Sequence, residues 1–436
     1  MKQSTLIFCF SRCILCVSVS LWLRCPVHAQ DKLTIEQSVA KAWADSPQAR
    51  VARAERDAAL AGVDREKPVA RPNITATAQV GAQTPQVTLP LRNGNNGLVV
   101  PNQFGLLNLT IEQTLWRAGL REATQRYTAQ KATAELGYRK ALGDIATAIR
   151  RAAIDVWRAE AGVGAAQEGL KFAQVYAESV GQRITAGVAK PVDAETIKAQ
   201  VAEAQTGLVE AENGLELAKL NFNRLLGRDL ETAFILEALG ELPEIPTSTK
   251  EAREAAYRNR LELVLLERGI EAARAGAKLA RLQDKPTLGI RGLLTEQTRT
   301  VLVPEFAAAA ILEIKIPFGE GARARQDAKA ANAQADKLAA QYDEAKQGIA
   351  VEIESAWRKM KNARQKIVLA EERLRGQLAT YTVAMKAYEV GRGTVIEVQA
   401  AGREVDAARF AKITAQFDLW AGWTELQAAQ GAYYGR

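Results

Sequence analysis

Residues 142–184 read LGDIATAIRRAAIDVWRAEAGVGAAQEGLKFAQVYAESVGQRI, and they carry an apolar or small side chain at alternating steps of three and four. The members of this seam are Leu142, Ile145, Ile149, Ala152, Val156, Ala159, Val163, Ala166, Leu170, Ala173, Ala177, Val180 and Ile184. A strict seven-residue repeat predicts a helix that supercoils left-handed against its neighbours. Because alanine occupies many of these positions, neighbouring backbones can approach closely. Such helices suit the wall of a cylinder, and taken alone they fit a soluble coiled coil equally well.

The predicted helix has no interruption from near Gly119 to near Ile184, which at about 1.5 Å per residue makes it on the order of 100 Å long. A short break follows at residues 187–191, and the seam resumes over residues 197–225. A second break lies at residues 391–394. Breaks of this length predict two antiparallel helical hairpins, each of which ends in one tip.

The chain repeats its own pattern. Gly62 and Pro72 recur as Gly276 and Pro286, 214 positions further on. A period near 200 is far beyond the roughly 20–50 residues of solenoid repeats. It indicates one large unit duplicated in tandem: short helix, strand, loop, strand, very long helix, tight turn, long helix. The predicted parts are a signal segment, residues 1–29, and one domain, residues 30–436, with repeats 30–227 and 248–436 joined by a linker, 228–247.

Four segments alternate between apolar and polar residues with period two, and each has roughly the 9–11 residues of a tilted strand that crosses a bilayer. They centre on residues 74–80, 107–112, 288–291 and 312–316. Four strands cannot close a barrel, and an open sheet edge cannot be left in lipid. A membrane-crossing sheet must therefore pool strands from several copies, and three copies would supply twelve. A small sheet that caps a soluble coiled coil is the alternative.

Residues 1–29 have the features of a secretory signal, with an apolar run at residues 14–23 and a small-residue cleavage site ending at Ala29. All four cysteines and the single histidine lie inside this segment. The mature chain would lack both residue types, which excludes thiol and imidazole nucleophiles, disulfides and Cys/His metal sites. We therefore predict neither an enzyme nor a cofactor or metal site. Lipidation at Cys25 is disfavoured because Arg24 precedes it.

The net charge of the chain is small, and its acidic and basic residues are interspersed. The formal net charge of +8 includes three basic residues of the signal segment, so the mature chain carries 8 − 3 = +5. Its basic residues alternate with acids along the helices, which disfavours a nucleic-acid partner. No apolar stretch after the signal approaches the ~18 residues of a transmembrane helix.

The duplication, the paired strands and two short phrases together resemble the TolC-like outer membrane efflux channels, also called outer membrane factors. The phrases are Tyr388-Glu389-Val390-Gly391 and Ala218-x-x-x-Phe222-x-x-Leu225-Leu226-Gly227. The resemblance covers essentially the whole mature chain. It implies a mainly α fold with a small transmembrane β part, assembled as a homotrimer with a shared twelve-stranded β-barrel and a helical tunnel in the periplasm.

The same resemblance implies an exit duct in the outer membrane of a Gram-negative bacterium, in contact with outer membrane lipid. Such a duct serves a tripartite efflux pump or a type I secretion system, and it docks to a periplasmic adaptor (membrane fusion protein) and an inner-membrane transporter. The exported substrate cannot be identified from the residues. The alternative from another class is a soluble periplasmic coiled-coil scaffold or chaperone.

In that family a polar network near the hairpin tips closes the tunnel. Tyr388 matches the network tyrosine, Asp193 matches its acceptor in the first hairpin, and Glu397 matches one position of an acidic ring. Each also has a simpler interpretation. The two acids lie where a carboxylate caps a helix start, and the tyrosine could be hairpin packing.

The chain departs from the family pattern at two gate positions. Ala400 stands where a second acidic ring is expected. The gate arginine would fall on Gly393, with Arg392 one residue early. The residues expected to contact an adaptor are those of the two tips: Gly187, Val188, Ala189, Lys190, Gly391, Arg392, Gly393 and Thr394.

Overall fold

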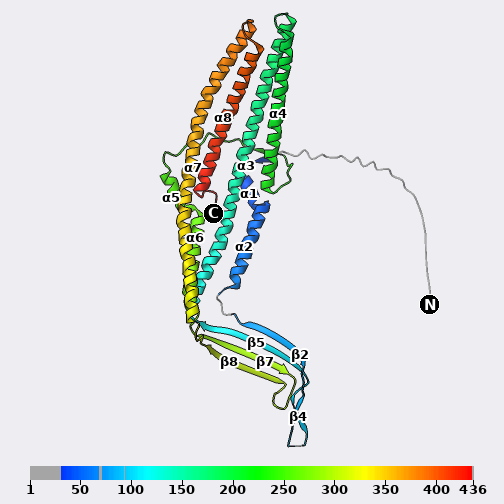
Figure 1. Ribbon diagram of the computed structural model, residues 1–436, viewed down its shortest axis with the longest axis vertical. Coiled ribbons are helices and arrows are strands. Elements are labelled where there is room, and N and C mark those ends of the chain that lie inside the picture. The colour runs from blue at the N-terminus through cyan, green and yellow to red at the C-terminus, as the bar shows by residue number, and fades with distance from the viewer. Residues whose placement is uncertain (1–30, 68–70, 93, 435–436) are drawn as a thin grey trace, which may run out of the picture.

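The computed structural model describes residues 31–67, 71–92 and 94–434. The predicted signal segment, with Cys25, lies outside the described residues. The molecule is a long bundle of helices with a β-sheet at one end (Figure 1). Within the described residues, no helix has the length and apolar content needed to cross a membrane.

Two long helical hairpins make up the upper body. The first consists of α3, Leu120–Thr185, and α4, Pro191–Leu226. The second consists of α7, Gly321–Glu389, and α8, Val395–Ala429. The 66 residues of α3 confirm the predicted uninterrupted helix. Both turns lie at the same end of the molecule, far from the sheet (Figure 1).

The helices lie side by side as a wall. On the side of the tips, α3 contacts α4 and α8, and α8 contacts α7. On the side of the sheet, α3 contacts α2, Pro47–Arg65, and α6, Leu261–Arg281, which in turn contacts α7. The short helices α1, Ile35–Asp45, and α5, Lys250–Asn259, pack against α3 and α7 near the middle. The wall is therefore four helices wide at either end.

The predicted strands form one antiparallel sheet in the order β2-β5-β7-β8. The strands are β2, Asn73–Ala82, β5, Gln103–Arg117, β7, Thr287–Gln297, and β8, Phe306–Lys315. At 15 residues, β5 is longer than the sequence predicted. The two halves of the chain meet between β5 and β7, so β2 and β8 are free edges in a single copy.

Four further strands were not predicted. A hairpin of β3, Val87–Pro90, and β4, Asn96–Val100, stands in the turn-rich loop between β2 and β5. A short parallel pair joins β1, Asp31–Leu33, to β6, Phe234–Leu236. The predicted linker 228–247 is thus partly folded, and Phe234 stacks on Phe222 of α4 with ring centroids 5.1 Å apart.

The register gives the sheet one apolar and one polar face. Leu109 pairs with Ala76 and Leu294 on the first face, where Val80 is 92% and Leu312 65% exposed. The other face is polar: Thr77 pairs with Asn108, which pairs with Thr295. On the same polar face Arg291 binds Glu112 at 2.8 Å and Glu313 at 2.9 Å. The sheet is therefore amphipathic, although Leu293 and Ile311 are apolar residues on the polar face.

Candidate functional site: the hairpin tips

Both tips are built on the same backbone turn. Gly187 and Gly391 adopt left-handed φ values of 73° and 74°, which favour glycine at the end of a helix. In each turn an N–H reaches back five residues to a helix carbonyl. Val188 N donates to Arg183 O at 3.0 Å, and Arg392 N donates to Ala387 O at 2.8 Å. The duplicated sequence thus produces two equivalent tips.

The two predicted gate acids each cap the helix that follows their tip. Asp193 Oδ2 accepts a hydrogen bond from Lys190 N at 3.2 Å. Glu397 Oε2 accepts from Thr394 N at 2.8 Å, while Thr394 Oγ1 accepts from Glu397 N at 3.3 Å. These bonds satisfy N–H groups that have no backbone acceptor at the start of a helix. Negative charge at this position is also favoured by the helix dipole.

A small apolar cluster lies beneath the tips and draws on all four long helices. Its buried members are Tyr176, Val180, Ile197, Tyr388, Val395 and Val398. The rings of Tyr176 and Tyr388 meet edge to face with centroids 5.7 Å apart. Burial, with a smaller contribution from the nearby Asp193 carboxylate, raises the pKa of the Tyr388 hydroxyl. The two hairpins therefore share a core at the tip end.

Tyr388 and Asp193 lie in the same region but are not hydrogen-bonded to each other. The Tyr388 hydroxyl is buried and makes no hydrogen bond of good geometry within the described residues, although the Arg183 side chain lies beside it and lowers its pKa against the effect of burial. Its ring instead packs against Tyr176 and lies 5.0 Å from the guanidinium carbon of Arg183. Arg183, which could not be identified from the sequence, makes a hydrogen-bonded contact between the hairpins at this end. Its place as the basic residue in the last turn of α3 was the available signal.

The structure gives a physical reason for the departure at Gly393. A Cβ at this position would lie 2.9 Å from Tyr388 N and 3.2 Å from the Ala387 carbonyl carbon. The turn therefore has no room for a larger residue there. Arg392, one position earlier, is exposed, and Ala400 is exposed on α8 one turn beyond the cap.

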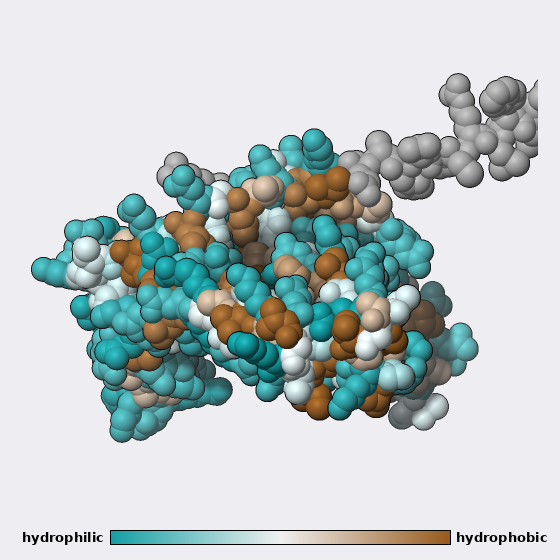
Figure 2. All heavy atoms as spheres, turned by 90° about the horizontal axis from the view of Figure 1, so that it is seen from above, coloured by the Kyte–Doolittle hydropathy of each residue, from teal (hydrophilic) through white to brown (hydrophobic). Residues whose placement is uncertain are grey.

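The tip end also presents apolar surface. Seen from above, apolar patches lie among hydrophilic residues (Figure 2). Four large apolar side chains in or beside the two turns are exposed: Val188, Val192, Val390 and Ile396. Two of them belong to each hairpin, as the duplication predicts.

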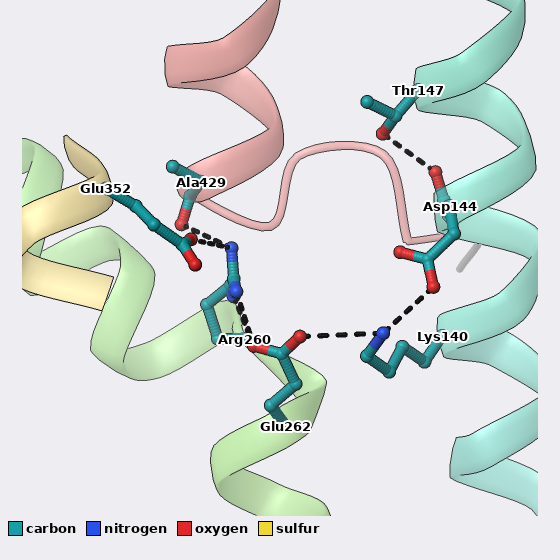
Figure 3. A network of polar contacts seen from close by, with 8 residues as sticks. Lys140, Asp144, Thr147, Arg260, Glu262, Glu352 and Ala429 are labelled. Carbon is teal, nitrogen blue, oxygen red and sulfur yellow. Dashed lines mark hydrogen bonds and ion pairs between the residues drawn. The ribbon is translucent and has the colours of Figure 1, made fainter. Parts of the chain in front are cut away.

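A second polar centre holds the middle of the molecule together (Figure 3). The Arg260 side chain is only 8% exposed, and its Nη1 lies 3.0 Å from Glu352 Oε2 on α7. It also bonds Glu262 on α6 and, at 3.4 Å, the Ala429 carbonyl oxygen at the end of α8. Lys140 on α3 completes the chain of contacts, 3.5 Å from Glu262. Arg260 thus links the second hairpin to the rest of the wall beside an open cavity of about 620 Å³.

Replacing Arg260 with alanine is expected to lower the unfolding temperature of the assembled protein in detergent, followed by circular dichroism. The loss leaves Glu352 and the Ala429 oxygen without their buried partner, which costs on the order of 2 kcal/mol. Arg268→Ala is the matched control, because Arg268 bonds Glu271 on the exposed face of α6, the helix that begins directly after Arg260. Equal unfolding temperatures for the two variants would contradict the role of Arg260 in linking the second hairpin to the rest of the wall.

No group of His, Cys, Asp and Glu side chains that could hold a metal ion occurs in the part of the chain that the structure describes. The tips and the central network are built from capping carboxylates, arginines and tyrosines. Their contacts hold helices together.

Comparisons with known proteins agree with this architecture. The family model described as "Outer membrane efflux protein" matches residues 39–228 and 252–432. A comparison with curated protein sequences finds no significant match. The fold is similar to the outer membrane protein VceC of Vibrio cholerae, with a TM-score of 0.73 and 18% identity over 91% of this chain and 96% of that one.

Two other solved channels share the fold. For the Campylobacter jejuni outer membrane channel CmeC, the TM-score is 0.75 and the identity 15%, over 92% of this chain and 86% of that one. For the Neisseria gonorrhoeae outer membrane channel MtrE, solved in an open state, the TM-score is 0.68 and the identity 16%, over 91% and 88%.

Proposed function

This chain belongs to the outer membrane efflux protein family, and from that membership we propose that three copies form the exit duct of a tripartite efflux pump or a type I secretion system. The family consists of efflux proteins and not of enzymes, and it places the chain in the outer membrane of a Gram-negative bacterium. The observation that carries the proposal is the open amphipathic sheet at the end of a long helical wall.

The sheet supports a barrel shared by three copies. The free edges β2 and β8 leave backbone groups unpaired in one copy, and lipid cannot satisfy them. Pairing β8 of one copy with β2 of the next closes a barrel of three times four, or twelve, strands. The apolar face then meets outer membrane lipid, while the face of Arg291, Glu112 and Asn108 lines the channel.

The helical wall supports a tunnel in the periplasm. In one copy α7 lies at one edge of the wall, and α4 and α2 lie at the other. Three such walls placed edge to edge enclose a cylinder that continues the barrel. Trp116, where β5 meets α3, and Phe318, just beyond β8, are exposed at the junction, as aromatic residues at a membrane interface are.

The tips support docking and gating. The exposed apolar residues Val188 and Val390 offer a surface to a periplasmic adaptor, which connects the duct to an inner-membrane transporter. We assign the gate to the tip residues Asp193, Tyr388, Arg392 and Glu397, together with the turns that carry them. Opening means that the hairpins separate at this end. The energy comes from the transporter.

Fractionation and conductance test the proposal. The mature protein is expected to sediment with the outer membrane, to run as a trimer in mild detergent and to form ion-conducting channels in planar bilayers. The soluble scaffold or chaperone predicts a water-soluble periplasmic protein that gives no channels. A stable monomer with no affinity for detergent or bilayers would exclude the duct.

A further inference from the structure

One side chain of the first hairpin, Arg183, holds the end of the second. Its Nη1 donates a hydrogen bond of 2.5 Å to the backbone oxygen of Glu389, 206 positions away in the chain. Its guanidinium carbon lies 5.0 Å from the centroid of the Tyr388 ring, within the range of a cation–π contact. Arg183 therefore touches two consecutive residues at the end of α7.

The Glu389 oxygen needs such a partner. The last carbonyls of a helix have no partner within the helix. In α7 the three preceding carbonyls, those of Lys386, Ala387 and Tyr388, accept hydrogen bonds from N–H groups of the following turn. The Glu389 oxygen is the next one along, and it accepts from Arg183. A cation at this position is also favoured by the negative end of the helix dipole.

Further from the tips the hairpins are also joined by ion pairs, such as those of Arg403 with Glu203 and of Arg409 with Glu168. The bond of Arg183 differs because it holds the end of α7 itself.

The hydroxyl of Tyr176 is buried and has no hydrogen-bond partner among the described residues. The buried hydroxyl of Tyr388 has none of good geometry, although the Arg183 side chain beside it lowers its pKa against the effect of burial. A buried polar group without a partner disfavours an arrangement. The apolar cluster thus brings the hairpins together at some cost, and the charge-assisted bond of Arg183 opposes that cost.

We propose that Arg183 is the positioning residue that locks the second hairpin to the first at the tips, and that opening begins with release of the Glu389 oxygen. This inference rests on the proposed function, because it names the residue that holds the same gate shut. The resemblance would place the gate arginine at Gly393 of the second hairpin, where a side chain has no room. In this chain the arginine that bridges the hairpins at their tips is Arg183, on the first hairpin.

Single-channel recording in planar bilayers tests the lock. Arg183→Ala is expected to conduct severalfold more than the wild type, because the second hairpin is no longer held. Arg183→Lys should fall between them, since it keeps the positive charge at the end of α7 but lacks the planar guanidinium. Arg375→Ala is the matched control, because Arg375 is an exposed arginine of α7 that pairs with Glu372 on the same helix, and its conductance should equal that of the wild type.

Proteolysis of the detergent-solubilised trimer gives an independent readout. Trypsin is expected to cut after Arg392 faster in Arg183→Ala than in the wild type, because the turn is released. If Arg183→Ala fails to assemble, single-channel conductance and the rate of tryptic cleavage are both measured on Arg183→Lys instead. Wild-type conductance together with a wild-type cleavage rate in the variant would overturn the lock. Absence of channels from the wild-type protein would instead overturn the exit duct itself.

Discussion

Replacing Leu294 with arginine is expected to eliminate membrane-inserted trimers. Leu294 lies at the centre of β7 on the apolar face of the sheet, between Leu109 and Ala308 on the neighbouring strands, and its side chain is exposed in a single copy. In the proposed barrel this face meets lipid. An arginine near the bilayer midplane costs about 2–4 kcal/mol for each chain, and every trimer would carry three. The measurement is the amount of heat-labile trimer recovered from the outer membrane fraction.

The adjacent residue provides the control. Thr295 points to the opposite face, where its hydroxyl donates to Asn108 Oδ1 at 2.9 Å. Thr295→Arg therefore adds the same charge one position away but directs it into the channel. Trimer recovery should stay near the wild-type amount. If Leu294→Arg assembles as well as Thr295→Arg, the apolar face does not meet lipid, and the orientation of the barrel proposed here is wrong.

Replacing Gly393 with arginine is expected to open the duct, although this change restores the residue that the family resemblance expects there. Any Cβ at this position would approach the Tyr388 backbone nitrogen to 2.9 Å, so the turn between α7 and α8 must shift. The shift moves the end of α7 away from Arg183. Channels of Gly393→Arg should therefore conduct more than the wild type, as single-channel recording would show.

The first hairpin supplies the matched control. Ala189 holds the position equivalent to Gly393, two residues after the left-handed Gly187, and it already carries a Cβ. Ala189→Arg adds the same charge at the other tip without a backbone clash, so its conductance should change much less. A Gly393→Arg channel that conducts less than the wild type would show that the arginine is accommodated and closes the gate.

The long helices and the sheet strands could be predicted because their signals are local. A seam with a seven-residue repeat predicts a helix wherever it occurs, and α3 runs from Leu120 to Thr185 as its seam indicates. Alternation with period two predicted β2, β5, β7 and β8 for the same reason. The hairpin β3–β4 was missed because Pro90 and the surrounding turn residues favour a loop.

Only part of the candidate site could be predicted from local sequence patterns. Asp193 and Glu397 stand at the starts of helices, and a capping role can be read from that position alone. Tyr388 was placed correctly at the tip, but its neighbours could not be known. The side chains of Tyr176 and Arg183 meet it from a helix about 200 positions earlier.

By itself, the sequence determined the duplicated hairpins, the four strands, the two glycine turns and the capping of the helices beyond them. All of these depend on residues close together in the chain. Only the tertiary structure decided that Arg183 holds Glu389, that Gly393 excludes a side chain and that Arg260 links α6, α7 and α8. These contacts depend on how two helices more than 60 residues long lie beside each other. A rotation or shift too small to alter either seam decides which side chains meet at their ends.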